Sequence, residues 1–333
     1  MNSYINILLN NWWINILLAM IIIFFDRRDP KSTLIWVMSL IFLPYLGFIL
    51  YLFLGGDYRK FKKFKLKAEE DRYIREASSL QSKKINEDLS FFENKESQKY
   101  KSLIELSLAL DEAFYTENND IKFFYFGKDK FKSFIEDIKN AKKSIDLEYY
   151  IFKHDNIGKY IIKILEKKAK EGVKVRILYD AVGSRRLHRY HFKELLKNGG
   201  KVCSFFPSFL KVVNFRLNYR NHRKLAIIDD KIGYIGGINI GDEYLGLSKK
   251  FGVWRDTHAR IEGESVLGMK LRFLKDWHYA SKEEVEGLES FDFNMSYKGY
   301  IGIQIITAGP DTKYDNIKNI MFNMITGAKK EIF

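Results

Sequence analysis

The sequence predicts an α/β body built on a mixed β-sheet flanked by helices, preceded by an N-terminal hairpin of two transmembrane helices. The body is predicted because segments of helix and strand character alternate from residue 123 onward, with glycines between several of them. The hairpin is predicted by two long apolar runs, residues 4–25 and 34–54. Each run is long enough to cross a bilayer as a helix, which takes roughly 20 residues.

The segment between the two runs is polar and contains Pro30, so we expect the runs to pair as a hairpin. No basic residue precedes the first run, which argues against a cleaved signal peptide. Residues 59–67 hold six Lys or Arg, against three in the turn, so the positive-inside rule places the C-terminal body in the cytoplasm. Two alternatives stay open: Pro44 could make the second run re-entrant, and the basic segment could be a solvated helix face.

Composition narrows the class of protein. The net charge of +14 favours a polyanionic partner, either nucleic acid or the anionic face of a membrane. The apolar runs favour the membrane. Cys203 is the single cysteine, which excludes an intrachain disulfide and a zinc site built from cysteines.

The apolar hairpin occupies residues 1–55, and a basic, helical connector is expected over residues 56–115. Helices and strands are then distinguished by apolar spacing, with Gly172 and Gly199 as helix stops. The expected order is helix 131–140, strand 144–152, helix 157–170, strand 173–179, helix 187–197 and strand 202–206.

An internal similarity joins the middle of the chain to its end. Residues 138–145 close a helix and open a strand around Ala-Lys-Lys, and residues 326–333 repeat that pattern. The similarity predicts that residues 116–300 form one domain and that residues 301–333 begin a second copy that is cut short.

One stretch carries a chemical pattern, H-x-K-x4-D-x6-G-G-x-N. Its apolar, β-branched flanks surround a turn at residues 229–231, so the stretch is predicted to be a β-hairpin in the sheet. Side chains two apart on a strand share a face about 7 Å apart, so the His and the Lys can address one phosphate. The six positions are His222, Lys224, Asp229, Gly236, Gly237 and Asn239.

Phosphodiester exchange needs a nucleophile that is neutral near pH 7, which suits His222. Lys224 supplies a positive charge for the phosphoryl oxygens as the transition state develops. Asp229 completes the catalytic candidates, although its place at the strand end favours bracing the hairpin over touching substrate.

The remaining motif positions are candidates for substrate binding. Asn239 offers a neutral donor. Gly236 and Gly237 carry no side chains, so the backbone there could approach substrate closely or bend sharply beneath it.

A chance match to all six positions in a chain of this length is negligible. The chain resembles the phospholipase D superfamily and, more narrowly, the bacterial cardiolipin synthases. The narrower resemblance rests on the N-terminal hairpin and on residues 141–152, 172–184 and 254–263, which follow in the same order. It covers nearly the whole chain and implies a phospholipase-D-like domain over residues 116–300 and the start of a second over residues 301–333.

The resemblance implies that His222 attacks the phosphorus of phosphatidylglycerol, forming phosphatidyl-histidine and releasing glycerol. A second phosphatidylglycerol then accepts the phosphatidyl group and yields cardiolipin. It implies no metal, nucleotide or other cofactor. The implied partners are the anionic phospholipid and the bacterial cell membrane, with a multi-pass anchor, a cytoplasmic body and no nucleic acid.

Family enzymes use two such motifs, one His as nucleophile and the other as general acid and base. The complete H-x-K-x4-D pattern occurs once in these 333 residues. Three explanations stay open: a fragment of a longer synthase, which the partial repeat favours; a self-associated pair of half-sites; and an inactive remnant.

Two further points stay open. Asp256 could orient His222, or it could form an ordinary ion pair with Arg255 or Arg260. A membrane-tethered phosphodiesterase or nuclease of the same superfamily would share the motif, whereas a purely structural membrane protein would not require it.

Overall fold

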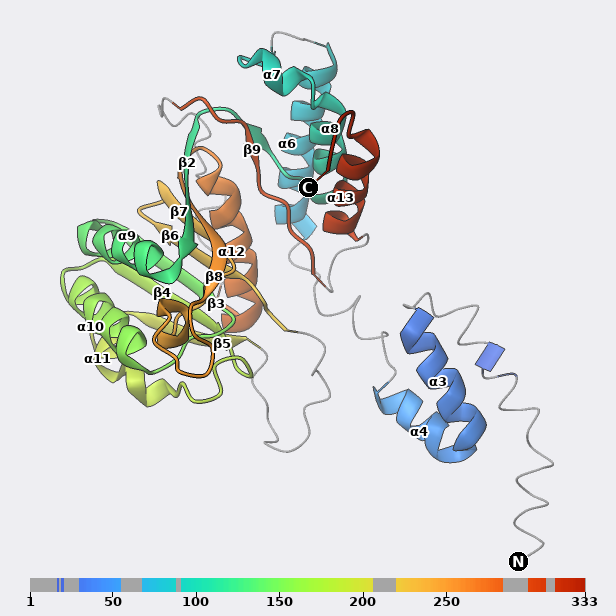
Figure 1. Cartoon of the computed structure of the whole chain (residues 1–333), viewed down its shortest axis with the longest axis horizontal. Helices are drawn as coiled ribbons and strands as arrows, with labels where there is room; N and C mark the ends of the chain where they lie inside the picture. The colour runs from blue at the N-terminus through green and yellow to red at the C-terminus, as the bar shows by residue number, and fades with distance from the viewer. Residues whose placement is uncertain are drawn as a thin grey trace, which may run out of the picture. The chain divides into compact units, whose positions relative to one another are not determined.

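The computed structural model describes residues 17, 19–20, 30–54, 68–87, 91–205, 220–283, 299–309 and 315–332 (Figure 1). The chain divides into two compact units, Met1–Lys65 and Leu66–Phe333. The first apolar run lies outside the described residues except at three positions, and the basic segment 59–67 lies wholly outside them.

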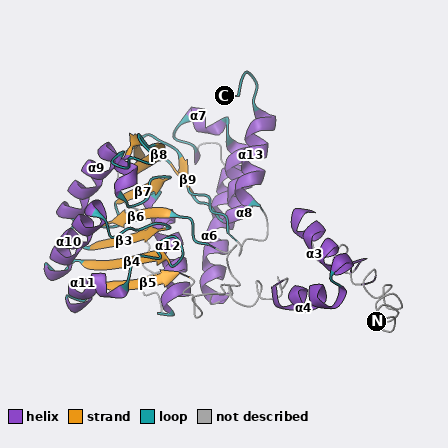
Figure 2. Ribbon diagram, turned by 60° about the horizontal axis from the view of Figure 1, so that its bottom comes forward, coloured by secondary structure: helices purple, strands orange, loops and turns teal. Residues whose placement is uncertain are grey.

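The larger unit is organised by a seven-stranded sheet in the order β2-β8-β7-β6-β3-β4-β5 (Figure 2). Strands β3, β4 and β5 are parallel, whereas the pairings β3–β6, β6–β7, β7–β8 and β2–β8 are antiparallel. This confirms the mixed sheet. The strands are β2 (Asn119–Phe126), β3 (Ser144–Tyr149), β4 (Lys174–Asp180), β5 (Lys201–Phe205), β6 (Lys224–Ile228), β7 (Ile232–Gly236) and β8 (Arg255–Gly263).

Helices cover both faces of this sheet. On one face lie α9 (Gly127–Asn140), α10 (Asn156–Lys170) and α11 (Lys193–Lys197), and on the other lies α12 (Val266–Ser281) (Figures 1 and 2). Helix α10 buries the apolar positions at helical spacing, and Asp155 caps its first turn by accepting from the Gly158 amide at 3.2 Å.

The face under α12 contains a buried ionic cluster. Asp146 on β3 is fully buried and accepts from Arg176 Nε at 2.6 Å and from Lys270 Nζ at 2.5 Å. Lys270 also lies 2.6 Å from Asp230 in the β6–β7 turn. These ion pairs therefore connect α12 to β3, to β4 and to the β6–β7 turn.

Several elements differ from the sequence expectation. β3 ends at Tyr149 rather than at Phe152, because Phe152 leaves the pairing with β6 and forms a bridge with Ile240. The expected helix 187–197 is the short 3₁₀ helix η3 (Arg189–Phe192) followed by α11. Strands β2 and β8 and helix α12 had no specific sequence prediction.

The connector forms helices α6 (Ala68–Glu87), α7 (Lys95–Gln98) and α8 (Lys101–Asp111), and α13 (Asn316–Gly327) packs against α8. The short strands β1 (Tyr115–Thr116) and β9 (Ile303–Gln304) pair beside them. Gln81 connects α6 to β1 through two hydrogen bonds. Its side chain accepts from the Tyr115 amide and donates to the Tyr115 carbonyl, both at 2.9 Å.

In the smaller unit the second apolar run forms two helices, α3 (Pro30–Phe42) and α4 (Pro44–Leu54), separated at Leu43. The proline after Leu43 explains the break, because it lacks an amide hydrogen and disfavours helix at the preceding residue. The run is therefore not the single helix that its length predicts.

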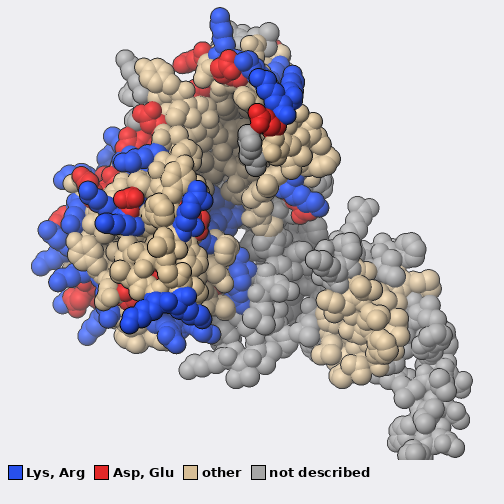
Figure 3. Space-filling model, in the orientation of Figure 1, with Lys and Arg blue, Asp and Glu red and all other residues tan. Residues whose placement is uncertain are grey.

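Helices α3 and α4 lie against each other. The rings of Trp36 and Tyr51 meet edge to face at 5.5 Å, and a Cβ on Gly47 would come within 2.5 Å of the Ser39 carbonyl oxygen. The described atoms of this unit that face the viewer in Figure 3 belong to neither basic nor acidic residues. Within the described part of the chain, no helix has both the length and the apolar character needed to cross a membrane.

Candidate active site

The His222–Lys224 pair of the motif lies at the end of the sheet where β6 begins. The parallel strands β3 and β4 have their carboxyl ends at this end of the sheet. The antiparallel strand β6 begins there too, because its first residue, Lys224, pairs with Tyr149, the last residue of β3. Residues from separate parts of the sequence therefore surround the start of β6.

The structure brings His222 and Lys224 together. The Lys224 Nζ lies 3.0 Å from His222 Nδ1 and donates to the His222 carbonyl oxygen at 2.5 Å. The Lys224 residue is 4% exposed, whereas His222 is exposed. A buried cation thus supports an imidazole that is open to solvent.

Burial controls the protonation of both groups. It lowers the pKa of Lys224 to about 8, an effect that the negative charge of Asp256 opposes. Burial and the Lys224 charge lower the pKa of His222, an effect that Asp180 opposes. A neutral imidazole beside an ammonium is therefore the dominant state at pH 7.

Tyr150 forms a wall of the site that the sequence did not single out. Its ring centroid is 4.5 Å from that of His222, and the Lys224 Nζ lies 5.1 Å from it. The aromatic face stabilises the ammonium and limits the positions of the imidazole. The position of Tyr150 just after a buried parallel strand is the signal that could have found it.

The residues on either side of His222 are anchored in a buried polar network. Asn221 donates from Nδ2 to Glu148 at 2.5 Å, and Arg223 lies 3.0 Å from Asp276. Burial, followed by the charge of Asp276, raises the pKa of Glu148, so Asp276 is the charged member that faces Arg223. Both neighbours of His222 are thereby held in place.

The structure places Asp229 apart from that pair, at the opposite end of β6. Its carboxylate accepts from the amides of Lys142 at 2.8 Å, Lys143 at 2.6 Å and Ser144 at 3.0 Å. Its φ of 54° lies in the left-handed region, which an aspartate tolerates better than most residues. Asp229 braces the β6–β7 turn against the start of β3.

We expect Asp229→Ala to lower the free energy of unfolding by about 2 kcal/mol, because the amides of residues 142–144 lose a charged acceptor. Asp229→Asn should lose less, since asparagine keeps one acceptor oxygen and tolerates the left-handed backbone. Urea unfolding followed by circular dichroism measures both. Unchanged stability with lost activity in Asp229→Ala would instead give this carboxylate a chemical role.

Gly236 and Gly237 are required by packing against β8. A Cβ on Gly236 would lie 2.5 Å from the Thr257 carbonyl oxygen, and one on Gly237 would collide with the Asp256 carboxylate. The space beside both glycines is thus occupied by β8, a neighbour that no local pattern in the sequence shows. Contact of this backbone with substrate stays a prediction.

Asn239 is also engaged by the protein. It accepts from the Ile151 amide at 3.0 Å and donates to the Tyr244 hydroxyl at 2.7 Å, and it is 4% exposed. Asn239 thereby holds the loop after β3 in place, and its contact with substrate stays a prediction.

Asp256 acts on Lys224, as its effect on the lysine pKa shows, and the acid whose charge reaches His222 is Asp180. The chain has one other His-x-Lys spacing, His191 and Lys193. It falls at the junction of η3 and α11, where residues two apart do not share a face as they do on a strand.

Two family models match the chain. Residues 134–260 match the model described as cardiolipin synthase, PLD-like domain, and residues 13–56 match the model described as phospholipase D-nuclease N-terminal. The first match contains the start of β6 and most of the sheet.

Curated relatives extend the similarity over nearly the whole chain. The cardiolipin synthase of Listeria monocytogenes serotype 4a (strain HCC23) is 44% identical over 326 residues, which cover 96% of this chain and 67% of the relative. The major cardiolipin synthase ClsA of Bacillus subtilis (strain 168) is 44% identical over 332 residues, covering 99% and 69%. The chain thus spans about two thirds of the length of these relatives.

Among solved structures, NucT from Helicobacter pylori is 24% identical with a TM-score of 0.38, covering 49% of this chain and 98% of that one. The phosphatidylserine synthase of Haemophilus influenzae Rd KW20 is 18% identical with a TM-score of 0.41, covering 68% and 47%.

Proposed function

This chain belongs to the cardiolipin synthases of the phospholipase D superfamily, and we propose that His222 is its nucleophile and Lys224 its electrostatic catalyst in phosphatidyl transfer. An imidazole nitrogen attacks the phosphorus of phosphatidylglycerol. The phosphorus–nitrogen bond forms as the bond to the head-group glycerol breaks.

The observation that carries this proposal is the 3.0 Å contact between Lys224 Nζ and His222 Nδ1. In the resting site the ammonium holds the imidazole neutral. A phosphate oxygen is a stronger, charged acceptor and draws the ammonium toward the substrate, which frees the imidazole for attack.

Two proton transfers complete the exchange. The departing glycerol alkoxide takes up a proton, and the terminal hydroxyl of a second phosphatidylglycerol later loses one as it attacks the phosphorus and releases the imidazole. The family resemblance assigns both transfers to a second motif. Cardiolipin and glycerol are the products.

We extend the proposal to the membrane surface. The helices α3 and α4 expose apolar side chains, among them Ile35 at 63% and Phe42 at 71%, and the basic segment 59–67 follows them in sequence. Apolar side chains that insert into lipid beside cations that attract anionic head groups would hold the larger unit at its substrate. The similarity to cardiolipin synthases favours lipid over nucleic acid as the substrate.

The decisive test is a covalent adduct. The full chain is incubated with vesicles of phosphatidylglycerol labelled in the phosphate, and acid-labile label on the protein is measured after a rapid quench. We expect His222→Asn to abolish the label and His278→Asn, a histidine at the end of α12, to retain it. Label that persists in His222→Asn would refute the proposed nucleophile, and cleavage of DNA without lipid adduct would refute the substrate.

A further inference from the structure

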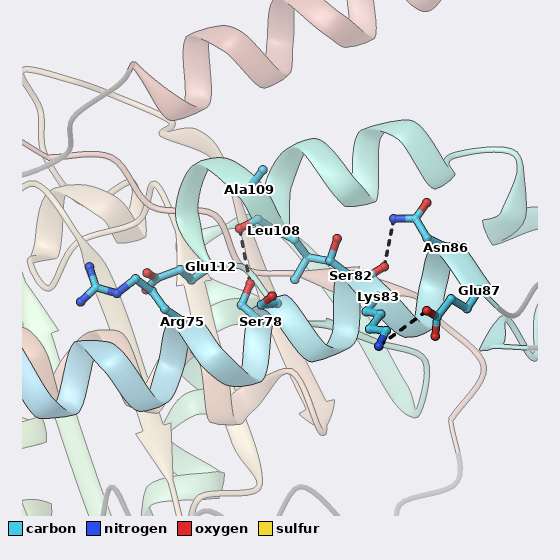
Figure 4. A pocket seen from close by; sticks show the side chains of 10 residues that line it. Arg75, Ser78, Ser82, Lys83, Asn86, Glu87, Leu108, Ala109 and Glu112 are labelled. Carbon is cyan, nitrogen blue, oxygen red and sulfur yellow. Dashed lines mark hydrogen bonds and ion pairs between the residues drawn. The ribbon is translucent and has the colours of Figure 1, made fainter.

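Two hollows outside the His222–Lys224 pair differ in chemistry. The one between α6 and α8, of about 570 Å³, is lined by serines and by Lys83, whose ammonium lies 3.7 Å from Glu87 (Figure 4). The other, of about 650 Å³, lies in the loops after β3 and β4. Both volumes suit a small ligand, but the second adjoins the candidate active site.

The second hollow, which we call the histidine pocket, shares a wall with the active site. Tyr150 lines the pocket and also contacts the His222 ring. Ser184, another lining residue, donates to the Tyr150 carbonyl at 3.1 Å and accepts from the Phe152 amide at 2.9 Å, which ties the two loops together. A ligand in this pocket would therefore lie next to the reacting histidine.

The charge of the lining is positive. Arg185 and Arg186 are exposed at the pocket, and Lys153 is paired with Glu243. The lining includes one acid, Asp155, whose oxygens accept from the amides of Gly158 and Asp242. Two guanidinium groups thus remain for an anionic ligand, and their planar donors match phosphate oxygens.

Three histidines complete the lining: His154, His188 and His191. The rings of His154 and His191 stack at 3.6 Å, and burial followed by neighbouring positive charges lowers the pKa of both. The His188 amide donates to His191 Nδ1 at 3.0 Å, so neutral His191 carries its hydrogen on Nε2. The imidazoles of His154 and His191 therefore add donors without adding a full charge at neutral pH.

We propose that the histidine pocket binds the phosphate of the second, acceptor phosphatidylglycerol. This inference rests on the proposed function. In cardiolipin the two phosphodiesters are joined by one glycerol, so the acceptor phosphate has to lie within a glycerol's length of the phosphorus bound at His222. The basic pocket shares Tyr150 with His222, so it lies on the side of the reacting histidine from which an acceptor hydroxyl could be positioned.

The test measures binding of soluble glycerol phosphate to the full chain by calorimetry. Arg185→Gln/Arg186→Gln should bind about tenfold more weakly, because two charge-assisted contacts are lost. The matched control, Lys163→Gln/Lys170→Gln, removes two exposed charges from α10 and should bind like wild type. Equal affinity in the arginine variant and wild type would overturn the proposal.

Two further arms separate this inference from the proposed function. His222→Asn should retain glycerol phosphate binding even though it forms no adduct. Loss of binding in this variant would mean that the anion binds beside His222 and not in the histidine pocket. The arginine variant should still form the histidine adduct from phosphatidylglycerol but transfer it poorly to acceptor. If adduct formation in the arginine variant fell as much as transfer to the acceptor, the pocket would bind the lipid that donates the phosphatidyl group, and the acceptor assignment would be refuted.

The source of the phosphate is distinguished by competition. Nanodiscs that contain phosphatidylglycerol should displace glycerol phosphate, whereas nanodiscs of phosphatidylcholine alone should not. If inorganic phosphate displaces it and phosphatidylglycerol nanodiscs do not, the pocket takes free phosphate and the lipid assignment falls.

Discussion

Replacing Lys224 by glutamine is expected to slow phosphodiester cleavage by about 10²–10³-fold, the usual cost of removing one positioned donor from a developing oxyanion. The large effect follows from burial, because Lys224 is 4% exposed and its charge acts in a medium of low dielectric. Nitrophenolate release from a nitrophenyl phosphodiester measures the rate with a leaving group that needs no general acid. Lys163→Gln, on the surface of α10, is the control, and an undiminished rate in Lys224→Gln would remove this lysine from the chemistry.

The same lysine should set the alkaline limb of the pH profile. Its pKa of about 8 means that the ammonium is present below that pH and is lost as the pH rises through it. The pKa of His222 is lowered below its usual value of 6.5, so the imidazole is already neutral where the ammonium titrates. We expect kcat/KM to fall with a midpoint near pH 8 in wild type. Lys224→Arg keeps its charge through this range, so a limb that stayed near pH 8 in that variant would belong to another group.

The largest loss of stability is expected from Asp146→Ala. Asp146 is fully buried between Arg176 and Lys270, whose side chains are 8% and 9% exposed. Removing the carboxylate takes the acid away from buried Arg176, while Lys270 keeps Asp230. Breaking a buried ion pair in this way typically costs about 3–5 kcal/mol.

Urea unfolding of Asp146→Ala beside Glu136→Gln, which removes an exposed acid from α9, measures this loss. We expect the control to unfold like wild type. If Asp146→Ala also unfolded like wild type, the cluster under α12 would not contribute to stability. A double variant that also replaces Arg176 by methionine should recover part of the loss, because an apolar chain replaces an unpaired charge.

Local periodicity was sufficient to predict the central body. The spacing of Ile161, Leu165 and Ala169 predicted α10, and Gly172 correctly marked its end. The hairpin of β6 and β7 followed from apolar runs around a polar turn. These elements were predictable because each one displays its buried face in consecutive residues.

Other elements could not be predicted from the sequence, because they depend on contacts between residues that are far apart along the chain. β8 pairs with β2 and β7 across long stretches of sequence, and no local pattern shows that Gly236 and Gly237 pack against it. The second apolar run satisfied the length for a membrane helix, yet it divides at Leu43 because the following proline interrupts the hydrogen-bond pattern.

The sequence by itself determined the motif and its family, and the two-residue spacing predicted that His222 and Lys224 lie together, although His222 precedes the first residue of β6. Only the tertiary structure decided which groups surround that pair. Tyr150, Asp180 and Asp256 come from three other segments. The order and direction of the strands bring them to the same end of the sheet. Their effects on charge act through space, and distances in space are set by strand pairing rather than by separation along the chain.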